Sequence, residues 1–191
     1  MAKRLFDILL ALLALLLLSP LMVAAALAVW LDSGRPVLFA QTRVGRGTQP
    51  FQLYKFRSMV VDASQRGPYN TRQNDPRITR VGRFLRRSSV DELPQLLNVL
   101  RGDMSVIGTR PERPQFVDDF NARIRYYSLR HCVKPGLTGW AQLRYPYGSS
   151  FEDAEEKLKF DLFYVKNHNF VFDLAILVQT VEVVLFGRGA R

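Results

Sequence analysis

The chain has 191 residues, of which 48% are hydrophobic and 12% aromatic, and this composition excludes a disordered protein and allows one domain with its own core. Its 27 Lys and Arg residues against 17 Asp and Glu give a formal net charge of +10, which indicates an anionic partner such as nucleic acid, a membrane surface or a phosphorylated substrate. A single cysteine and two histidines exclude an internal disulfide and a cysteine-based zinc site, and they disfavour a histidine-rich metal site.

The first element is an apolar segment from Ile8 to Leu31 that contains no charged residue. At 1.5 Å per residue, about 24 residues reach roughly 36 Å, which is enough to cross the hydrocarbon core of a bilayer. Ser19 and Pro20 lie near the middle, where proline removes a backbone donor and its ring breaks or kinks a helix. The segment therefore predicts two short helical arms.

Basic residues on both sides of this segment predict its topology. They are Lys3, Arg4, Arg35, Arg43 and Arg46. Because positively charged flanks stay in the cytoplasm, a re-entrant helix over residues 1–34 satisfies both flanks, whereas a kinked single span satisfies only one. The alternatives are that single span and a cleaved signal peptide, although the apolar run is longer than the ~7–15 residues usual for a signal peptide.

A short β-hairpin is predicted next to the membrane segment. The residues from Pro36 to Tyr54 alternate, and β-branched and aromatic side chains lie on both sides of Gly45-Arg46-Gly47. A polar surface loop follows from Asp62 to Asp75. Residues 35–191 contain no internal repeat and no clear domain break, so we expect one continuous unit.

A basic helix is predicted after this loop, with Asp75 as its cap and Pro76 in its first turn. The spacing places three apolar side chains on one side (Ile78, Val81 and Phe84) and four arginines on a neighbouring face (Arg77, Arg80, Arg83 and Arg87). Such a basic stripe is either solvated or rests on anionic lipid headgroups.

Two adjacent carboxylates, Asp91 and Glu92, begin the next predicted helix, which ends at Gly102. Two starts are compatible with the pattern. Ser89 and Glu92 fit a capping box, whereas Asp91 as the cap places Pro94 within the first turn. Acids in a first helical turn also stabilise the helix dipole, and this is the purely structural interpretation of the pair.

The rest of the chain is expected to be mostly helical. One helix follows Pro114 and ends at Leu129, and the apolar spacing predicts another from Phe151 to His168. The stretch from Phe170 to Phe186 is too short and too polar for a span, and we expect it to pack in the core or to lie in the membrane interface. The fold class is therefore α+β and predominantly helical.

The surroundings of the acidic pair favour a chemical role. A carboxylate beside helix N–H groups and arginines stays ionised, so Asp91 is a candidate nucleophile or magnesium ligand. The same positive charge would hold the phosphates of a substrate. An aspartate can accept a phosphoryl group as an acyl phosphate, which divides a difficult transfer into two easier steps.

Five motifs in order resemble the bacterial sugar transferase family, also called the monotopic phosphoglycosyl transferases. They are the broken membrane helix with Ser19-Pro20, YKFRSM at 54–59, DELPQL at 91–96 with Asn98, GDMSVIGTRP at 102–111 and KPGLTGWAQ at 134–142. The resemblance covers essentially the whole chain. One position departs from it, because the family often reads Gly-Pro-Arg-Pro where this chain has Gly108-Thr109-Arg110-Pro111.

The resemblance implies an enzyme that transfers a sugar 1-phosphate from a UDP-sugar to undecaprenyl phosphate and releases UMP, as the first membrane step of exopolysaccharide or glycoconjugate synthesis. By this resemblance Asp91 is the nucleophile, Glu92 assists it, and both carboxylates hold Mg²⁺. The phosphate-binding cations are matched to Lys55, Arg57, Arg86 and Arg110.

The resemblance also implies a location and partners. We expect a re-entrant helix over residues 1–34 in the bacterial cytoplasmic (inner) membrane, with the catalytic unit 35–191 and its interfacial helices on the cytoplasmic face. Membrane lipids are partners, nucleic acid is not, and a homodimer is compatible with apolar helix faces. The motifs leave open the donor sugar, the residues that contact it, and whether the chain is a minimal enzyme or a catalytic fragment. An anchored binding module and a glycosyltransferase that releases UDP are the alternative functions.

Overall fold

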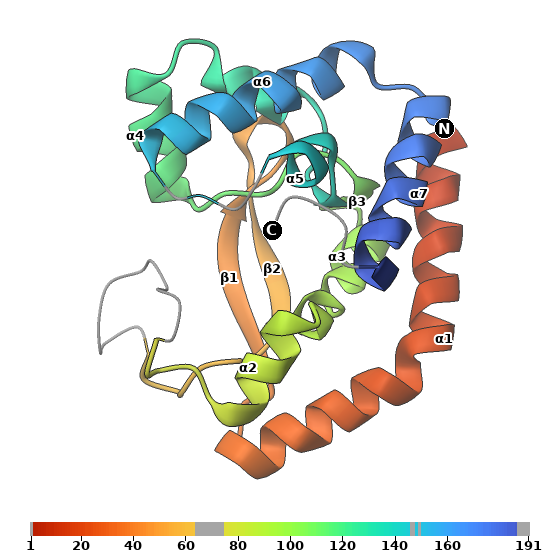
Figure 1. Ribbon diagram of the computed structural model, residues 1–191, viewed down its shortest axis with the longest axis vertical. Helices are drawn as coiled ribbons and strands as arrows, with labels where there is room; N and C mark the ends of the chain where they lie inside the picture. The colour runs from red at the N-terminus through yellow and green to blue at the C-terminus, as the bar shows by residue number, and fades with distance from the viewer. Residues whose placement is uncertain (1, 64–74, 146–147, 149, 187–191) are drawn as a thin grey trace.

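The computed structural model describes residues 2–63, 75–145, 148 and 150–186 (Figure 1). Its elements in chain order are α1 (Ala2–Ser33), β1 (Leu38–Val44), η1 (Arg46–Thr48), β2 (Pro50–Phe56), α2 (Arg80–Arg87), η2 (Val90–Glu92), α3 (Gln95–Arg101), β3 (Ser105–Ile107), α4 (Pro114–Arg123), η3 (Tyr127–Cys132), β4 (Gly136–Thr138), α5 (Trp140–Arg144), α6 (Phe151–Asn167) and α7 (Phe170–Phe186), where η marks a 3₁₀ helix. The predominantly helical α+β class is confirmed.

The N-terminal element α1 is one helix of 32 residues that contains Pro20. Figure 1 shows a bend between its two arms, which agrees with the predicted kink, although the helix continues through the bend without a break. Proline leaves the carbonyl of the residue four positions earlier without its usual donor, and here that residue is Leu16. The Ser19 hydroxyl donates to this carbonyl at 2.9 Å. The serine thus satisfies the group that the proline releases, and the helix continues through the bend.

Most of the apolar surface of α1 is exposed. The exposed leucines are Leu5, Leu9, Leu12, Leu13, Leu16, Leu17, Leu21, Leu27 and Leu31. The helix is long and apolar enough to cross a membrane by length and composition. Its narrow inner stripe is buried, with Ala11 in the core formed by α3, β3, α6 and α7, and with Ala25 and Val29 packed on Leu85 of α2. The exposed leucines make α1 the membrane-associated part of the chain.

The first turns of α1 are bonded to the globular part of the chain. Lys3 forms an ion pair of 2.6 Å with the buried Asp173 of α7. Arg4 donates to the carbonyl of Leu100 at 2.7 Å. Asp7 is buried, and its Oδ1 accepts from the Ser105 hydroxyl at 3.0 Å and from the amide of Val106 at 3.1 Å.

The last turn of α1 is bonded to the same body. The Arg57 guanidinium donates to the carbonyls of Ser33 at 2.7 Å and Gly34 at 2.6 Å. The Asp32 carboxylate accepts from the amide of Val81 at the start of α2, at 3.2 Å. Both ends of the apolar helix are therefore held by one folded unit, and its middle projects from that unit (Figure 1).

Several local predictions are confirmed. β1 and β2 pair antiparallel with Leu38 opposite Phe56 and Val44 opposite Pro50, which is the predicted hairpin. α6 lies where the apolar spacing placed it and begins with a capping box between Ser150 and Asp153, and α7 has the bounds of the predicted apolar stretch from Phe170 to Phe186. The predicted helix from Pro114 to Leu129 is shorter, because α4 ends at Arg123 and a 3₁₀ helix follows it.

The predicted start of the basic helix is wrong. α2 begins at Arg80, and its cap is Thr79, whose hydroxyl accepts from the amide of Gly82 at 2.9 Å. Asp75 instead forms a buried ion pair with Arg77 at 2.6 Å, which removes both residues from the helix. Phe84 was predicted on the apolar side, but 68% of it is exposed, on the outer face beside the arginines.

Neither predicted cap before α3 is present. Ser89 adopts a left-handed conformation with φ of 57°, and its side chain makes no capping hydrogen bond. Asp91 lies inside the 3₁₀ turn η2, and Pro94 separates this turn from α3. The C-terminal prediction is confirmed, because Gly102 ends α3 with φ of 98°, a conformation that glycine adopts without strain.

A parallel pair of short strands was not predicted. β3 pairs with β4, with Ser105 opposite Gly136 and Ile107 opposite Thr138, and an isolated bridge between Thr109 and Pro135 extends the pairing. Three-residue strands are too short to show a period in the sequence. This pairing positions the segment after β3, which includes Arg110, next to the hairpin.

Gly82 gives a test of how α2 is seated. A Cβ at this position would lie 2.0 Å from the carbonyl oxygen of Ser58. We therefore expect Gly82→Ala to lower the free energy of unfolding by about 1–3 kcal/mol, because backbone must move to admit the methyl group. Denaturant titration in detergent measures the effect. The matched control is Arg83→Ala on the exposed face, and equal midpoints for the two variants would contradict this packing.

Candidate active site

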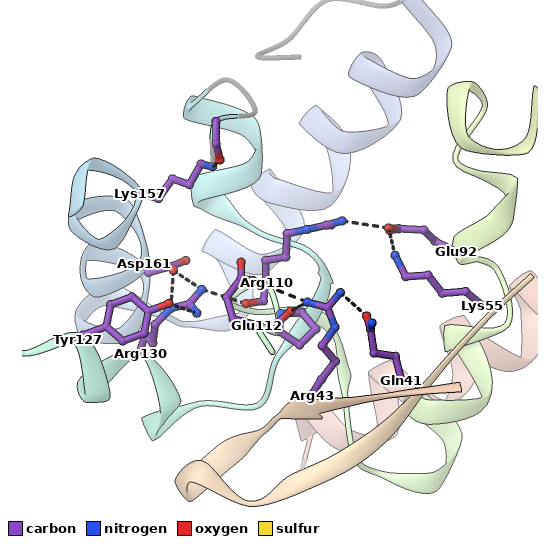
Figure 2. Close-up of polar contacts among 12 residues, drawn as sticks. Gln41, Arg43, Lys55, Glu92, Arg110, Glu112, Tyr127, Arg130, Lys157 and Asp161 are labelled. Carbon is purple, nitrogen blue, oxygen red and sulfur yellow. Dashed lines mark hydrogen bonds and ion pairs between the residues drawn. The ribbon is translucent and has the colours of Figure 1, made fainter. Parts of the chain in front are cut away.

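Glu92 is fixed by two cations from different parts of the chain. Its Oε1 accepts from Lys55 Nζ of β2 at 2.6 Å and from Arg110 Nη2 of the segment after β3 at 3.0 Å (Figure 2). Burial alone would raise the pKa of the Glu92 carboxyl, but the charges of Arg110 and Lys55 hold it well below its usual range. Glu92 is therefore ionised, and its Oε1 is engaged by two cations.

The register between β2 and α3 explains how Lys55 reaches Glu92. Asn98 of α3 is fully buried, and its side chain accepts from the amide of Tyr54 at 3.1 Å and donates to the carbonyl of Gln52 at 2.7 Å. This bridge replaces the missing neighbouring strand at the edge of β2. It aligns Lys55, which follows Tyr54 in β2, with the turn η2, which contains Glu92 and precedes α3.

Asp91 differs from its neighbour, because it is buried and has no bonded partner among the described residues. The residue is only 8% exposed, and in the described part of the chain neither of its carboxylate oxygens forms a hydrogen bond or ion pair. Burial raises the pKa of the Asp91 carboxyl to about 6, and the charge of Glu92 adds to the rise, while Lys55, Arg86 and Arg110 oppose it. Asp91 is therefore a largely ionised carboxylate at neutral pH whose oxygens are available to a ligand.

A cavity of about 600 Å³ lies near the acidic pair, and its lining includes Ser89 and Arg110 but neither Asp91 nor Glu92. Its lining contains six cationic side chains (Arg43, Arg86, Arg87, Arg110, Arg130 and Lys157) and two acidic ones (Glu112 and Asp161). The lining also contains the aromatic rings of Phe116, Phe120, Tyr127 and Tyr145. Such a lining suits a ligand that carries both phosphates and a ring.

The structure brings together most of the predicted site residues. Lys55 and Arg110 bond to Glu92, and Arg86 lines the cavity and acts electrostatically on Asp91. Arg57 is placed apart from them. It is buried and donates to carbonyls at the end of α1, as described above, so its contacts give a phosphate-binding role no support.

Sequence reasoning missed six charged residues of the cavity: Arg43, Arg87, Glu112, Arg130, Lys157 and Asp161. Arg130 and Asp161 form a buried ion pair of 2.7 Å, although 31 positions separate them in the chain. No local spacing marks such a pair. The only signal available was the net positive charge of the chain.

The acidic pair can be tested against the requirements of magnesium. Within the described ranges no three His, Cys, Asp or Glu side chains cluster to hold a metal ion. Mg²⁺ usually binds through one or two protein carboxylates together with substrate phosphates and water. The unpartnered oxygens of Asp91 fit that requirement, whereas Oε1 of Glu92 is already occupied by two cations.

A buried, unpartnered carboxylate surrounded by arginines, next to an exposed apolar helix, defines a membrane-associated site for phosphate chemistry. The family model for bacterial sugar transferases matches residues 1–187, so the chain belongs to the bacterial sugar transferase family.

Three relatives show how far this similarity extends. The UDP-N-acetylgalactosamine-undecaprenyl-phosphate N-acetylgalactosaminephosphotransferase of Aeromonas hydrophila is 46% identical over 99% of this chain and 45% of its own length. The UDP-glucose:undecaprenyl-phosphate glucose-1-phosphate transferase of Escherichia coli (strain K12) is 47% identical over 94% of this chain and 39% of its own length. The exopolysaccharide production protein PSS of Rhizobium leguminosarum bv. phaseoli is 45% identical over 94% of this chain and 92% of its own length. The chain thus spans less than half of the first two relatives and most of the third.

The two carboxylates are expected to affect stability in opposite directions. The raised pKa of Asp91 means that its charge destabilises the fold above pH 6, and that this penalty is gone below its unfolded pKa near 4. Asp91→Asn should therefore stabilise the protein at neutral pH by up to about 3 kcal/mol. Glu92→Gln should destabilise it by roughly 2 kcal/mol or more, because Lys55 and Arg110 lose their counter-charge.

Thermal unfolding in detergent with EDTA, at several pH values, measures both effects. The gain from Asp91→Asn should shrink as the pH falls from about 6 towards 4, because the native carboxyl then becomes protonated. A lower melting temperature for Asp91→Asn than for the unmodified protein at pH 7.5 would contradict this assignment.

Proposed function

We propose that the chain transfers a sugar 1-phosphate from a UDP-sugar to undecaprenyl phosphate and releases UMP, the first membrane step in exopolysaccharide or glycoconjugate synthesis. Two relatives at 46% and 47% identity carry such an activity in their names. The observation that carries the proposal is the contrast within the acidic pair. Glu92 is bonded to two cations, and Asp91 is buried with both oxygens available.

In the first step a carboxylate oxygen of Asp91 attacks the phosphorus that bears the sugar. A bond forms between that oxygen and the phosphorus, and the bond from the phosphorus to the oxygen bridging the two phosphates breaks. UMP leaves with the bridging oxygen and its electron pair. The sugar phosphate remains on Asp91 as an acyl phosphate. The cations around the site offset the charge on the phosphoryl oxygens during this transfer.

In the second step an oxygen of undecaprenyl phosphate attacks the same phosphorus. The bond between phosphorus and Asp91 breaks, the carboxylate is restored, and the product is undecaprenyl diphosphate sugar. Both nucleophiles are anions, so no proton has to be removed for either attack. Glu92 contributes by fixing Lys55 and Arg110 at the site.

Magnesium fits this scheme through Asp91, with Glu92 contributing its second carboxylate oxygen. When bound, Mg²⁺ would neutralise charge on the diphosphate of the donor. The cavity accepts the rest of the donor, with arginines for the phosphates and aromatic walls for the uridine or the sugar. The names of the two relatives differ in their sugar at nearly equal identity, so overall similarity does not select the donor.

We also propose that α1 is re-entrant and that residues 35–191 form the catalytic unit on the cytoplasmic face. The bonds at both ends of α1 support this arrangement. Lys3 and Arg4 bind to α7 and α3, while Asp32 and Ser33 bind to α2 and to Arg57. Contacts of both helix ends with one folded body favour a placement of these ends on the same face of a bilayer.

Cysteine labelling tests this topology. In a Cys132→Ser background, Ala2→Cys and Gln49→Cys place a thiol before and after α1 at exposed positions. We expect a membrane-impermeant maleimide to label both in inside-out vesicles and neither in intact spheroplasts, because the basic flanks stay in the cytoplasm. Labelling of the two positions from opposite sides would mean that α1 spans the membrane.

Nucleotide release tests the activity. With Mg²⁺, undecaprenyl phosphate and a panel of UDP-sugars, we expect the purified protein to release UMP from at least one donor. Asp91→Asn should lower the rate at least about 10³-fold, because no acyl phosphate can form. Folding of the variant is checked by its melting temperature.

The identity of the released nucleotide separates the alternatives. UDP in place of UMP would indicate plain glycosyl transfer. UMP release that is unchanged in Asp91→Asn would exclude the proposed nucleophile. No release from any donor by folded protein would favour an anchored binding module.

A further inference from the structure

The segment that carries Arg110 is held from two sides, by the buried Arg130 and by the partly buried Arg43. We propose that Arg130 and Arg43 are positioning residues that aim Arg110 at Glu92 and into the cavity. Neither arginine has to touch the reacting atoms for this role. The kinetic part of the inference rests on the proposed function, whereas its structural part does not.

Arg130 holds the backbone of Arg110 itself. Its Nη2 donates to the carbonyl of Arg110 at 2.9 Å, and to Oδ2 of Asp161 at 2.7 Å (Figure 2). Its Nε donates to the same carboxylate oxygen at 2.9 Å, and its Nη1 donates to the Tyr127 hydroxyl at 3.1 Å. Asp161 and Tyr127 thus fix the plane of the guanidinium, and one edge of it is directed at the Arg110 carbonyl.

Arg43 holds the next residues from the hairpin side. Its Nη1 donates to the carbonyl of Pro111 at 3.0 Å and lies 3.6 Å from the Glu112 carboxylate. Its Nη2 donates to Gln41 at 2.8 Å, and this bond orients the guanidinium along β1. The amide of Val44 also donates to the carbonyl of Glu112, at 2.9 Å.

Thr109 adds a bond in the opposite direction. Its hydroxyl donates to the carbonyl of Arg130 at 3.3 Å, while the Arg130 guanidinium donates to the carbonyl of Arg110. Two hydrogen bonds therefore join the segment to η3. This is the position at which the chain has threonine where the family often has proline, and the hydroxyl bond restrains the backbone that a proline ring would stiffen.

The bonds to the carbonyls of Arg110 and Pro111 matter because the Arg110 side chain is only partly packed against its surroundings. Its side chain is 39% exposed, yet it must meet Glu92 at 3.0 Å and line the cavity at the same time. An exposed arginine loses much rotamer freedom when it is held in one geometry. Fixing its backbone at two successive carbonyls reduces the number of side-chain positions that reach Glu92.

Lysine cannot replace arginine in this arrangement. Arg130 binds a carboxylate, a hydroxyl and a carbonyl with three nitrogens in one plane, whereas lysine presents a single ammonium on a flexible stem. Arg130→Lys keeps the charge opposite Asp161 and so keeps the fold. It gives up the directed bond to Arg110.

A double-mutant cycle tests the proposal. We expect Arg130→Lys to lower kcat/KM for the UDP-sugar by about 10- to 100-fold, since small misplacements at a reacting centre have effects of that size. In an Arg110→Ala background the same change should alter kcat/KM by less than about twofold, because the residue being positioned is gone. Arg43→Lys, which removes the bond from the other side, should behave in the same way.

The matched control is Arg77→Lys. It makes the same chemical change in another buried Arg–Asp pair, the one with Asp75, whose bonds to other described residues do not involve Arg110. We expect this variant to lose stability but to retain kcat/KM within about twofold.

Hydrogen exchange gives a readout that does not depend on activity. The amides of Val44 and Gly136 donate to the carbonyls of Glu112 and Thr109, so their exchange reports whether the segment stays attached. We expect faster exchange at both in Arg130→Lys, and rates in Arg77→Lys equal to those of the unmodified protein. Exchange within α3 should not change in Arg130→Lys.

Several outcomes would overturn the proposal. Folded Arg130→Lys with kcat/KM within twofold of the unmodified protein, a loss that persists undiminished with Arg110→Ala, or an equal loss in Arg77→Lys would each do so. If the unmodified protein releases no nucleotide from any donor, the proposed function fails, and the exchange comparison alone decides the positioning role. Unchanged exchange at Val44 and Gly136 would then reject it.

Discussion

The contact of Lys55 and Arg110 with one oxygen of Glu92 sets the chemistry of the site, because it joins a strand, a turn and the segment after β3 at one point. Two positive charges on a single carboxylate leave its surroundings net positive. Asp91, one residue earlier, lies in that field without forming a bond of its own. One acid of the pair is fixed so that the other remains both ionised and available. A pair with interchangeable roles would not have this asymmetry.

The arrangement reduces the stability of the fold at the site. Burial raises the pKa of Asp91 to about 6 and lowers the pKa of Arg43 to about 10, so both groups are held in places that disfavour their charged forms. Arg130 has the opposite balance, because Asp161, Tyr127 and Glu112 together outweigh burial and raise its pKa, whereas burial raises the pKa of Asp161. Stability that is lost at the proposed nucleophile is compatible with function only where neighbouring contacts hold the loops in place.

The sequence allowed prediction of the features that depend on nearby residues. The apolar spacing of α6, the length of α7 and the alternating hairpin are local patterns, and they were predicted correctly. The caps at Asp75 and Ser89 were predicted by equally local rules and were wrong, because a buried partner for Asp75 and a left-handed Ser89 override cap preference. Arg130 contacts Asp161 and Arg43 contacts Pro111 across 31 and 68 positions, and no spacing rule reaches that far.

The bend of α1 connects the membrane segment to the site. The Ser19 hydroxyl satisfies the Leu16 carbonyl that Pro20 leaves open, so the helix turns inside an apolar medium without exposing an unbonded backbone group. The polar bonds of Lys3, Arg4 and Asp32 lie at the ends of the helix, where water or headgroups are available to charged side chains. In the proposed re-entrant arrangement, a bent helix held at both ends would fix the depth of the attached body. Because α2 packs on the second arm and η2 packs on α2, Asp91 would then lie near the headgroup layer, where a lipid phosphate is presented.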